Sequence, residues 1–318
     1  MGNYIVRRVL EAIPVILAMS IVVFLVMHLM PGGPLARFLE NPRLAHTMDL
    51  KALKHAWGLD RPLYVQYWLW LKGMLQGNWG YSFISGQHAT TMIQDALWPT
   101  LSLLGISLIL TVLLGVPLGV YQATHPYTIT DHILTLFSYV FYAFPTFFLG
   151  YLMLLIFAVD VRIFPAGGMV TPGVPFHLSD FLMHLALPMM TLTLVNLAGY
   201  SRYMRSSVLG TLGQDYIRTA RAKGVSRQAL IWKHAVRNAL IPLINILALS
   251  IAFIFSGAVF TEYVFSWPGM GSLFINSALQ QDYSPLMAIL FISGTLVIVF
   301  NILADLAMAA ADPRITYS

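Results

Sequence analysis

Six long stretches of this chain contain no Asp, Glu, Lys or Arg, and they limit its possible folds more than any other feature. Each is at least as long as the roughly 20 residues with which a helix crosses about 30 Å of hydrocarbon. The composition agrees, with 58% hydrophobic and only 10% charged residues. The sequence therefore predicts an all-α, polytopic membrane protein with six transmembrane helices, at Ala12–Leu35, Ala96–Thr130, Ile133–Val159, Phe181–Ser201, Asn238–Thr261 and Tyr283–Ala304.

The first apolar stretch has a secretory signal peptide as its rival interpretation, because Arg7 and Arg8 precede it. Its apolar core is longer than the usual ~7 to 15 residues, and it ends in MPGGP rather than in a small-x-small cleavage site. We therefore expect a retained first helix.

The short loops predict the orientation of the chain. Eight of the eighteen Lys and Arg lie in one segment, 202–237, two more precede the first span, and Arg314 follows the last. The loop between the fifth and sixth spans contains Glu262 and Asp282 but no basic residue. Since basic residues accumulate on the cytoplasmic side, both termini and segment 202–237 are expected there.

Several classes of function are excluded or disfavoured. The chain has no cysteine and no phosphate-binding loop, HExxH or GxSxG motif, so it is not expected to be an enzyme. His125 and His132 lie beside a turn and are interpreted as solvated, and no metal site is predicted. The net charge of +5 is concentrated beside the membrane and does not indicate nucleic acid. Ion-coupled carriers usually have ionisable groups inside their spans, and the middles of these spans have no Asp, Glu, Lys or Arg.

Segment 202–237 has more internal order than charge placement alone requires. Asp215 is expected to cap a short helix, with Arg221 and Lys223 near its negative end, and Gly224 is expected to stop it in the left-handed conformation. Ser226 is expected to cap the following helix.

The following helix is expected to be amphipathic. One predicted face is apolar and the other is basic or polar. The apolar face contains Trp232, Ala235, Val236, Ala239 and Leu240, and the other contains Lys233, His234, Arg237 and Asn238. A short basic helix can bind a soluble partner, and its rigid connection to an amphipathic helix would let that partner move the next span.

Two further features allow alternatives. Gly115 and Gly119 form a small-xxx-small pair, which serves packing within one subunit or contact with a second one. The segment 31–97 is rich in Trp and Tyr, with Pro62 at an expected helix start, and it forms an interfacial aromatic belt, a docking surface for an external partner, or both.

Long strings of this sequence resemble one known family nearly from end to end. They are YIVRRVLEAIP, FLVMHLMPGGP, GLDRPLYVQYWLWLKGMLQGNWGYS, ALWPTLSLLGISLILTVLLGVPLGV, DYIRTARAKG, KHAVRNALIP, TEYVFSWPGMGSLFINSALQQDYSPL and ADPRITY. The chain resembles the permease subunits of peptide-type importers driven by ATP-binding-cassette (ABC) proteins, specifically the first of the two permeases in dipeptide and oligopeptide systems. The resemblance implies the type I ABC importer permease fold.

The family's coupling loop corresponds to the ordered part of the basic segment. The residues expected to couple to an ATPase are Asp215, Tyr216, Arg218, Thr219, Ala220, Arg221, Lys223 and Gly224. The family consensus EAAxxxG falls on Arg218, Thr219, Ala220 and Gly224, so two positions depart from it. Because Arg218 replaces the consensus carboxylate, an acidic patch on the partner is the complementary expectation.

The resemblance also implies the partners. The chain would form a heterodimer with a second permease, with the translocation path between them, in a prokaryotic inner or plasma membrane. Two cytoplasmic ABC ATPase subunits would bind ATP and Mg²⁺, this chain would bind no cofactor, and an extracytoplasmic solute-binding protein would deliver peptides. Import of nickel chelates, glutathione or another small solute is the alternative, and a secondary carrier, a channel or an assembly subunit is the alternative class.

We expect three regions along the chain. The first helix and an extracytoplasmic segment occupy 1–97, a permease core with a cytoplasmic coupling loop at 206–240 occupies 98–312, and a tail occupies 313–318. Polar groups in or near the fourth and fifth spans are candidates for the translocation path or for bonds to a neighbouring helix: Asn196, Tyr200, Asn245 and Ser256. The tight loop SWPGMGSL is the candidate outer gate or receptor contact, through Ser266, Trp267, Pro268, Gly269 and Gly271.

Overall fold

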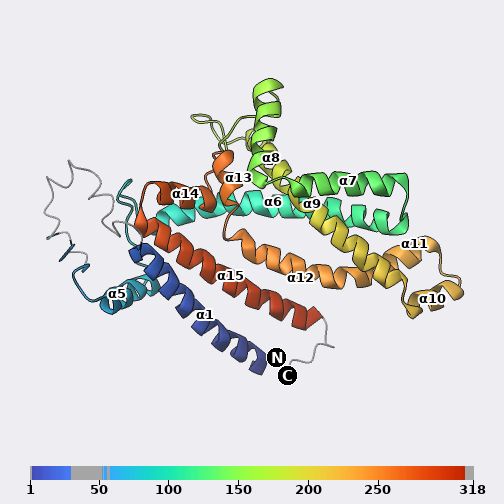
Figure 1. The fold of residues 1–318 in the computed structure, drawn as a ribbon, viewed down its shortest axis with the longest axis horizontal. Helices are drawn as coiled ribbons and strands as arrows, with labels where there is room; N and C mark the ends of the chain where they lie inside the picture. The colour runs from blue at the N-terminus through green and yellow to red at the C-terminus, as the bar shows by residue number, and fades with distance from the viewer. Residues whose placement is uncertain (1, 30–51, 53, 56–57, 312–318) are drawn as a thin grey trace.

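The computed structural model describes residues 2–29, 52, 54–55 and 58–311, and this part of the chain is built from helices (Figure 1). Its only strand-like feature is one isolated antiparallel bridge between Tyr81 and His88. The helices are α1 (Gly2–Leu29), α5 (Leu63–Leu75), α6 (Ala89–Thr124), α7 (Ile129–Ala143), α8 (Thr146–Met153), η2 (Leu154–Asp160), α9 (Leu178–Leu212), α10 (Asp215–Ala222), α11 (Arg227–Ala229), η3 (Leu230–Val236), α12 (Arg237–Ile254), α13 (Val259–Val264), α14 (Met270–Leu279) and α15 (Tyr283–Ala311).

Four of the predicted spans are confirmed as single helices long and apolar enough to cross a membrane. They are α1, α6, α9 and α15. The described part of the first span ends at Leu29, and its predicted remainder, 30–35, lies outside the described residues. The fourth span is longer than predicted, because α9 continues to Leu212 and takes in the first part of the basic segment.

The third and fifth predicted spans are each divided into two helical parts at a bend. Between α7 and α8 the axis turns by 102°, where Pro145 lacks the N–H that would continue the helix. The stretch from Arg227 to Ile254 bends by 42° just before Pro242, and a break then separates α12 from α13. The described residues thus contain four helices long and apolar enough to cross a membrane, or up to six spans if each bent pair counts as one.

α6 and α9 pack with their backbones in close approach. A Cβ atom on Gly119 would lie 2.4 Å from the carbonyl oxygen of Ser201, and one on Gly115 would lie 3.0 Å from the Cβ of Tyr200. The small-residue pair therefore packs within the subunit, the first of its two predicted uses.

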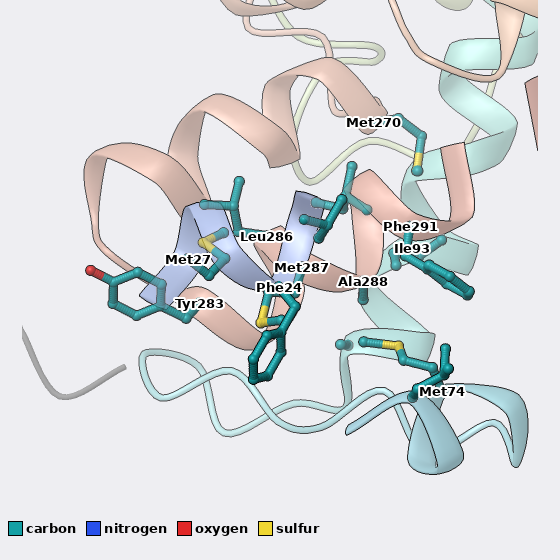
Figure 2. Packing of buried hydrophobic residues seen from close by; sticks show 14 of the residues in the cluster. Phe24, Met27, Met74, Ile93, Met270, Tyr283, Leu286, Met287, Ala288 and Phe291 are labelled. Atoms are coloured by element: carbon teal, nitrogen blue, oxygen red, sulfur yellow. The ribbon is translucent and has the colours of Figure 1, made fainter. Parts of the chain in front are cut away.

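The packing at the α5 end of the bundle joins segments far apart in sequence. Figure 2 shows Phe24 of α1, Met74 of α5, Ile93 of α6, Met270 of α14 and Met287 of α15 in one apolar cluster. Figure 1 places α10 and α11 at the other end of α9 and α12. Near the start of α1, Arg8 pairs with Asp305 of α15 at 2.9 Å.

Candidate functional site

α10 is a short, exposed and basic helix that begins one residue earlier than predicted, at the residue that was expected to cap it. Asp215 is its first residue, and Gln214 occupies the cap position without a side-chain hydrogen bond. The Asp215 carboxylate still lies in the first turn, where the helix dipole favours it. Gly224 has φ +78°, and Ser226 accepts a hydrogen bond from the N–H of Ala229, so the predicted stop and second cap are confirmed.

Most of the predicted coupling residues are open to solvent. Seven of the eight are exposed and Ala220 is half-buried. Arg218 makes one exposed ion pair, 3.5 Å from Asp215, which solvent screens strongly. The exposed set comprises Asp215, Tyr216, Arg218, Thr219, Arg221, Lys223 and Gly224, and it brings three cations and one anion to one small surface.

One side chain that sequence reasoning missed holds α10 against the rest of the protein. Ile217 is fully buried among Leu212, Val225, Leu230 and Ala235. Burying an Ile side chain is worth about 1.5–3 kcal/mol. A polar contact adds to it, because the Asn238 side-chain amide donates to the Tyr216 hydroxyl at 3.0 Å. α10 is thereby tied to the start of α12.

The predicted apolar face of the next helix is correct except at its first residue. Ala235, Val236 and Ala239 are buried, whereas Trp232 is 56% exposed. The reason is the π-helical turn η3, whose wider winding does not follow the 3.6-residue period used to assign the face. Trp232 therefore joins the exposed surface near α10.

Two arginines of segment 202–237 make contacts with other residues of the same chain. Arg205 lies 2.7 Å from Asp131, whose side chain is only 4% exposed at the start of α7. Arg202 lies over the rings of Tyr139 and Tyr142, 5.1–5.4 Å from their centroids. These contacts fix α7 to α9. Counting basic residues in each loop could not predict such contacts.

The predicted outer loop is built around a buried carboxylate. Glu262 was placed by the sequence in the loop between the fifth and sixth spans, and its side chain is fully enclosed. It accepts hydrogen bonds from Thr100 at 2.8 Å and from the N–H groups of Gly271 and Ser272 at 2.7 and 3.1 Å. A Cβ on Gly269 would lie 2.4 Å from this carboxylate, so only glycine fits.

The same loop presents few side chains outward. Trp267 is fully buried and donates from Nε1 to the carbonyl of Pro99 at 2.8 Å, and Gly269 and Gly271 are buried as well. Ser266 and Pro268 are exposed and border an outer pocket of about 490 Å³. Of the five predicted gate or contact residues in this loop, only Ser266 and Pro268 are therefore exposed.

Three of the four predicted path residues meet in one pocket of about 270 Å³. Asn196 and Tyr200 of α9 line it together with Ser256, which follows α12. The side chain of Asn245 on α12 lies outside the described part of the structure. Among the described residues, no cluster of three or more His, Asp or Glu side chains is placed to hold a metal ion.

Comparison with known proteins gives the same picture over the whole length of the chain. Residues 115–317 match the family of binding-protein-dependent transport system inner membrane components, and residues 1–104 match the family's N-terminal region. The chain is 40% identical over 318 residues to the oligopeptide transport system permease protein AppB of Bacillus subtilis (strain 168), covering 100% of both chains. It is 35% identical over 317 residues to the glutathione transport system permease protein GsiC of Salmonella choleraesuis (strain SC-B67), again covering 100% of both.

Multi-pass helices, an exposed helix between the fourth and fifth spans, and full-length matches all agree. The chain belongs to the family of inner membrane permease components of binding-protein-dependent ABC transport systems.

Proposed function

We propose that this chain is one of two permease subunits of an ATP-driven peptide importer, with six spans and both termini in the cytoplasm. A second permease would complete the translocation path, and an external solute-binding protein would deliver the peptide. Peptide is the favoured solute because the relative from Bacillus subtilis, named an oligopeptide permease, matches at 40% identity from end to end. The solute, the partners and their number rest on this kinship.

The observation that carries the proposal is the construction of α10. Its exposed surface carries Arg218, Arg221 and Lys223, while Ile217 anchors it and Asn238 joins it to α12. A helix that is exposed on one side and clamped on the other transmits a push to the span behind it. An ATPase can shift the inward-open and outward-open states because it would contact α10 differently in each.

The test is charge reversal on α10 in the reconstituted complex. Arg221→Glu should reduce peptide-stimulated ATP hydrolysis and peptide uptake at least tenfold, because it places a carboxylate where an acidic ATPase surface is expected. Lys72→Glu is the matched control, since Lys72 is an exposed cation on α5 at the other end of the molecule. It should leave both rates within about twofold, as surface charges contribute little.

Gly224→Pro complements the charge variant, because Pro cannot adopt the φ of +78° at this position and distorts the end of α10. It should uncouple ATP hydrolysis from uptake while the chain still reaches the membrane. Normal uptake by both variants would refute the coupling role. Uptake by the permeases in the absence of any ATPase would instead support a secondary carrier or a channel.

Glutathione is the second candidate solute, because the relative from Salmonella named a glutathione permease is 35% identical over the whole chain. Competition distinguishes the two candidates. Uptake of labelled trialanine that excess glutathione does not reduce would support peptides as the solute, whereas uptake of labelled glutathione that excess trialanine does not reduce would support glutathione.

A further inference from the structure

The pocket between α6, α9 and α12 is lined by an unusual set of polar side chains. α6, α9 and the C-terminal part of α12 with the residues just after it contribute two polar side chains each. The remaining lining residues are Leu, Phe, Ile and Gly. We call this the hydroxyl pocket, and its polar members are Ser107, Thr111, Asn196, Tyr200, Ser250 and Ser256. No Lys, Arg, His, Asp or Glu is among its lining residues.

Three Ser and Thr side chains of the pocket donate their hydroxyl hydrogens to backbone carbonyl groups. Ser107 donates to the carbonyl of Leu103, Thr111 to that of Ser107, and Ser256 to that of Phe253, each at 2.7 Å. A hydroxyl group has one hydrogen and two lone pairs. Once the hydrogen is committed to the backbone, the oxygen can only accept.

The Tyr200–Ser250 bond has a direction that its neighbours determine. The two hydroxyl oxygens are 2.7 Å apart, and Ser250 also lies 2.8 Å from the carbonyl of Ile246. The carbonyl can only accept, so Ser250 donates to it and Tyr200 donates to Ser250. The Tyr200 oxygen is then left with its lone pairs.

Asn196 follows the same rule. Its side-chain nitrogen donates to the carbonyl of Leu192 at 2.8 Å, which fixes the orientation of the amide, because an amide oxygen cannot donate. The amide oxygen is therefore not used in this bond, and Asn196 is an exposed residue of the pocket lining. All six polar side chains thus have a hydroxyl or amide oxygen available as an acceptor.

A lining of oxygen acceptors selects its ligand by chemistry. A carboxylate would meet lone pairs without donors, whereas a protonated primary amine brings three N–H donors that need several acceptors from different directions. The volume of about 270 Å³ falls below the roughly 300–1,000 Å³ of sites that enclose a whole small molecule. The pocket therefore suits one end of a larger solute.

We propose that the hydroxyl pocket binds the protonated amino terminus of a peptide during its passage. This inference rests on the proposed function and adds the direction in which the peptide is bound. The amino end of the peptide, and not its carboxyl end, enters the pocket between α6, α9 and α12. Of its lining residues, Asn196 is exposed and Thr111 is fully buried.

The first test compares two changes at Asn196 in the reconstituted importer, with trialanine as the solute. Asn196→Leu removes the acceptor and should raise the KM for uptake about tenfold, the usual effect of one lost hydrogen bond to a charged group. Asn196→Asp retains acceptor oxygens and adds negative charge, so its KM should equal or fall below that of the wild type. Equal impairment of both variants would overturn the proposal.

The second test removes a hydroxyl from each of two matched threonines. Thr111→Val should raise the KM for trialanine, whereas Thr295→Val should not, although Thr295 on α15 donates to the carbonyl of Phe291 at the same 2.7 Å. Equal effects of the two substitutions would show that only helix packing is disturbed.

The third test uses peptides with blocked ends, after each is shown to bind the solute-binding protein. Thr111→Val should impair uptake of trialanine and of its carboxyl-terminal amide, and should leave uptake of N-acetyl-trialanine unchanged. Impairment of all three peptides would refute amino-end recognition. If the binding protein rejects the acetylated peptide, the comparison of Asn196→Leu with Asn196→Asp decides whether the pocket binds the amino terminus. A wild-type complex that takes up no peptide would refute the proposed function, whereas normal uptake with insensitive variants would refute this inference alone.

Discussion

Glu262 shows how a single side chain organises the loop between α13 and α14. Its carboxylate is enclosed between α6, α13 and the loop before α14, and it accepts from the hydroxyl of Thr100 and from three backbone N–H groups. A buried charge without partners would cost several kcal/mol, so these donors are what makes the position tolerable. The loop that contains Trp267 is shaped around this carboxylate.

Replacing Glu262 should therefore cost more stability than replacing an exposed acid. In Glu262→Gln the amide NH₂ faces donors that need acceptors, and each donor left unpaired costs about 1–3 kcal/mol. Thermal unfolding of the purified complex should show a clear fall in Tm. Glu11→Gln is the control, because Glu11 is exposed and pairs only at the surface with Arg7 and Arg8, worth about 0–1 kcal/mol. Equal shifts in Tm would contradict the role given to Glu262.

At the scale of elements, the start of α7 is locked to α9 by the contact between Asp131 and Arg205. Asp131 also accepts from the N–H of Tyr127, and Arg205 is partly open to solvent, 26% exposed. Breaking a buried pair leaves an uncompensated charge, whereas removing both charges is often nearly neutral. The direction of the effect therefore depends on which partners are removed.

A double-mutant cycle tests this contact. Arg205→Met alone should destabilise the protein by about 2 kcal/mol, less than a fully buried pair would lose, because the arginine is partly exposed. Adding Asp131→Asn should recover most of the loss, since no unpaired charge remains. Unfolding midpoints of the two single variants and the double variant give the coupling, and additive losses would show that the two side chains are independent.

Particular elements show which parts of the fold and site were predictable. Spans such as α6 and α15 and the stop of α10 at Gly224 were predictable because hydropathy and backbone preference are local properties. The bond between Thr100 and Glu262 joins residues 162 positions apart and has no local signature. The size of the turn at Pro145 was not predictable, because an apolar run does not reveal how far the axis turns.

For the whole molecule, α12 connects the two ends. Its beginning is tied to α10 through Asn238, and beyond its end Gly257 lies against the loop that Glu262 holds. Gly257 has φ +79°, and a Cβ there would lie 2.7 Å from the N atom of Gly271. Under the proposed coupling role, a push on α10 would have a packed route through α12 to the loop that contains Trp267.

Gly257→Ala should obstruct this route. The left-handed backbone costs a non-glycine residue about 1–2 kcal/mol, and the clash with Gly271 adds to it. Gly77→Ala separates the two effects, because Gly77 has the same φ of +79° and nothing within 4 Å of its Cβ position. Both variants should lower Tm, but only Gly257→Ala should reduce peptide-stimulated ATP hydrolysis. A matching loss of hydrolysis in Gly77→Ala would contradict the proposed route.

The π-helical turn η3 gives this connection a tolerance to changes in chain length. A π turn holds about one residue more than an α turn, so deleting one residue within Leu230–Val236 restores regular winding and leaves both flanks in register. The same deletion inside α12 would rotate Ser250 by roughly 100° away from Tyr200, since an α-helix has 3.6 residues per turn. Chains of this kind can therefore differ by one residue at η3 and still keep the polar faces of their helices aligned.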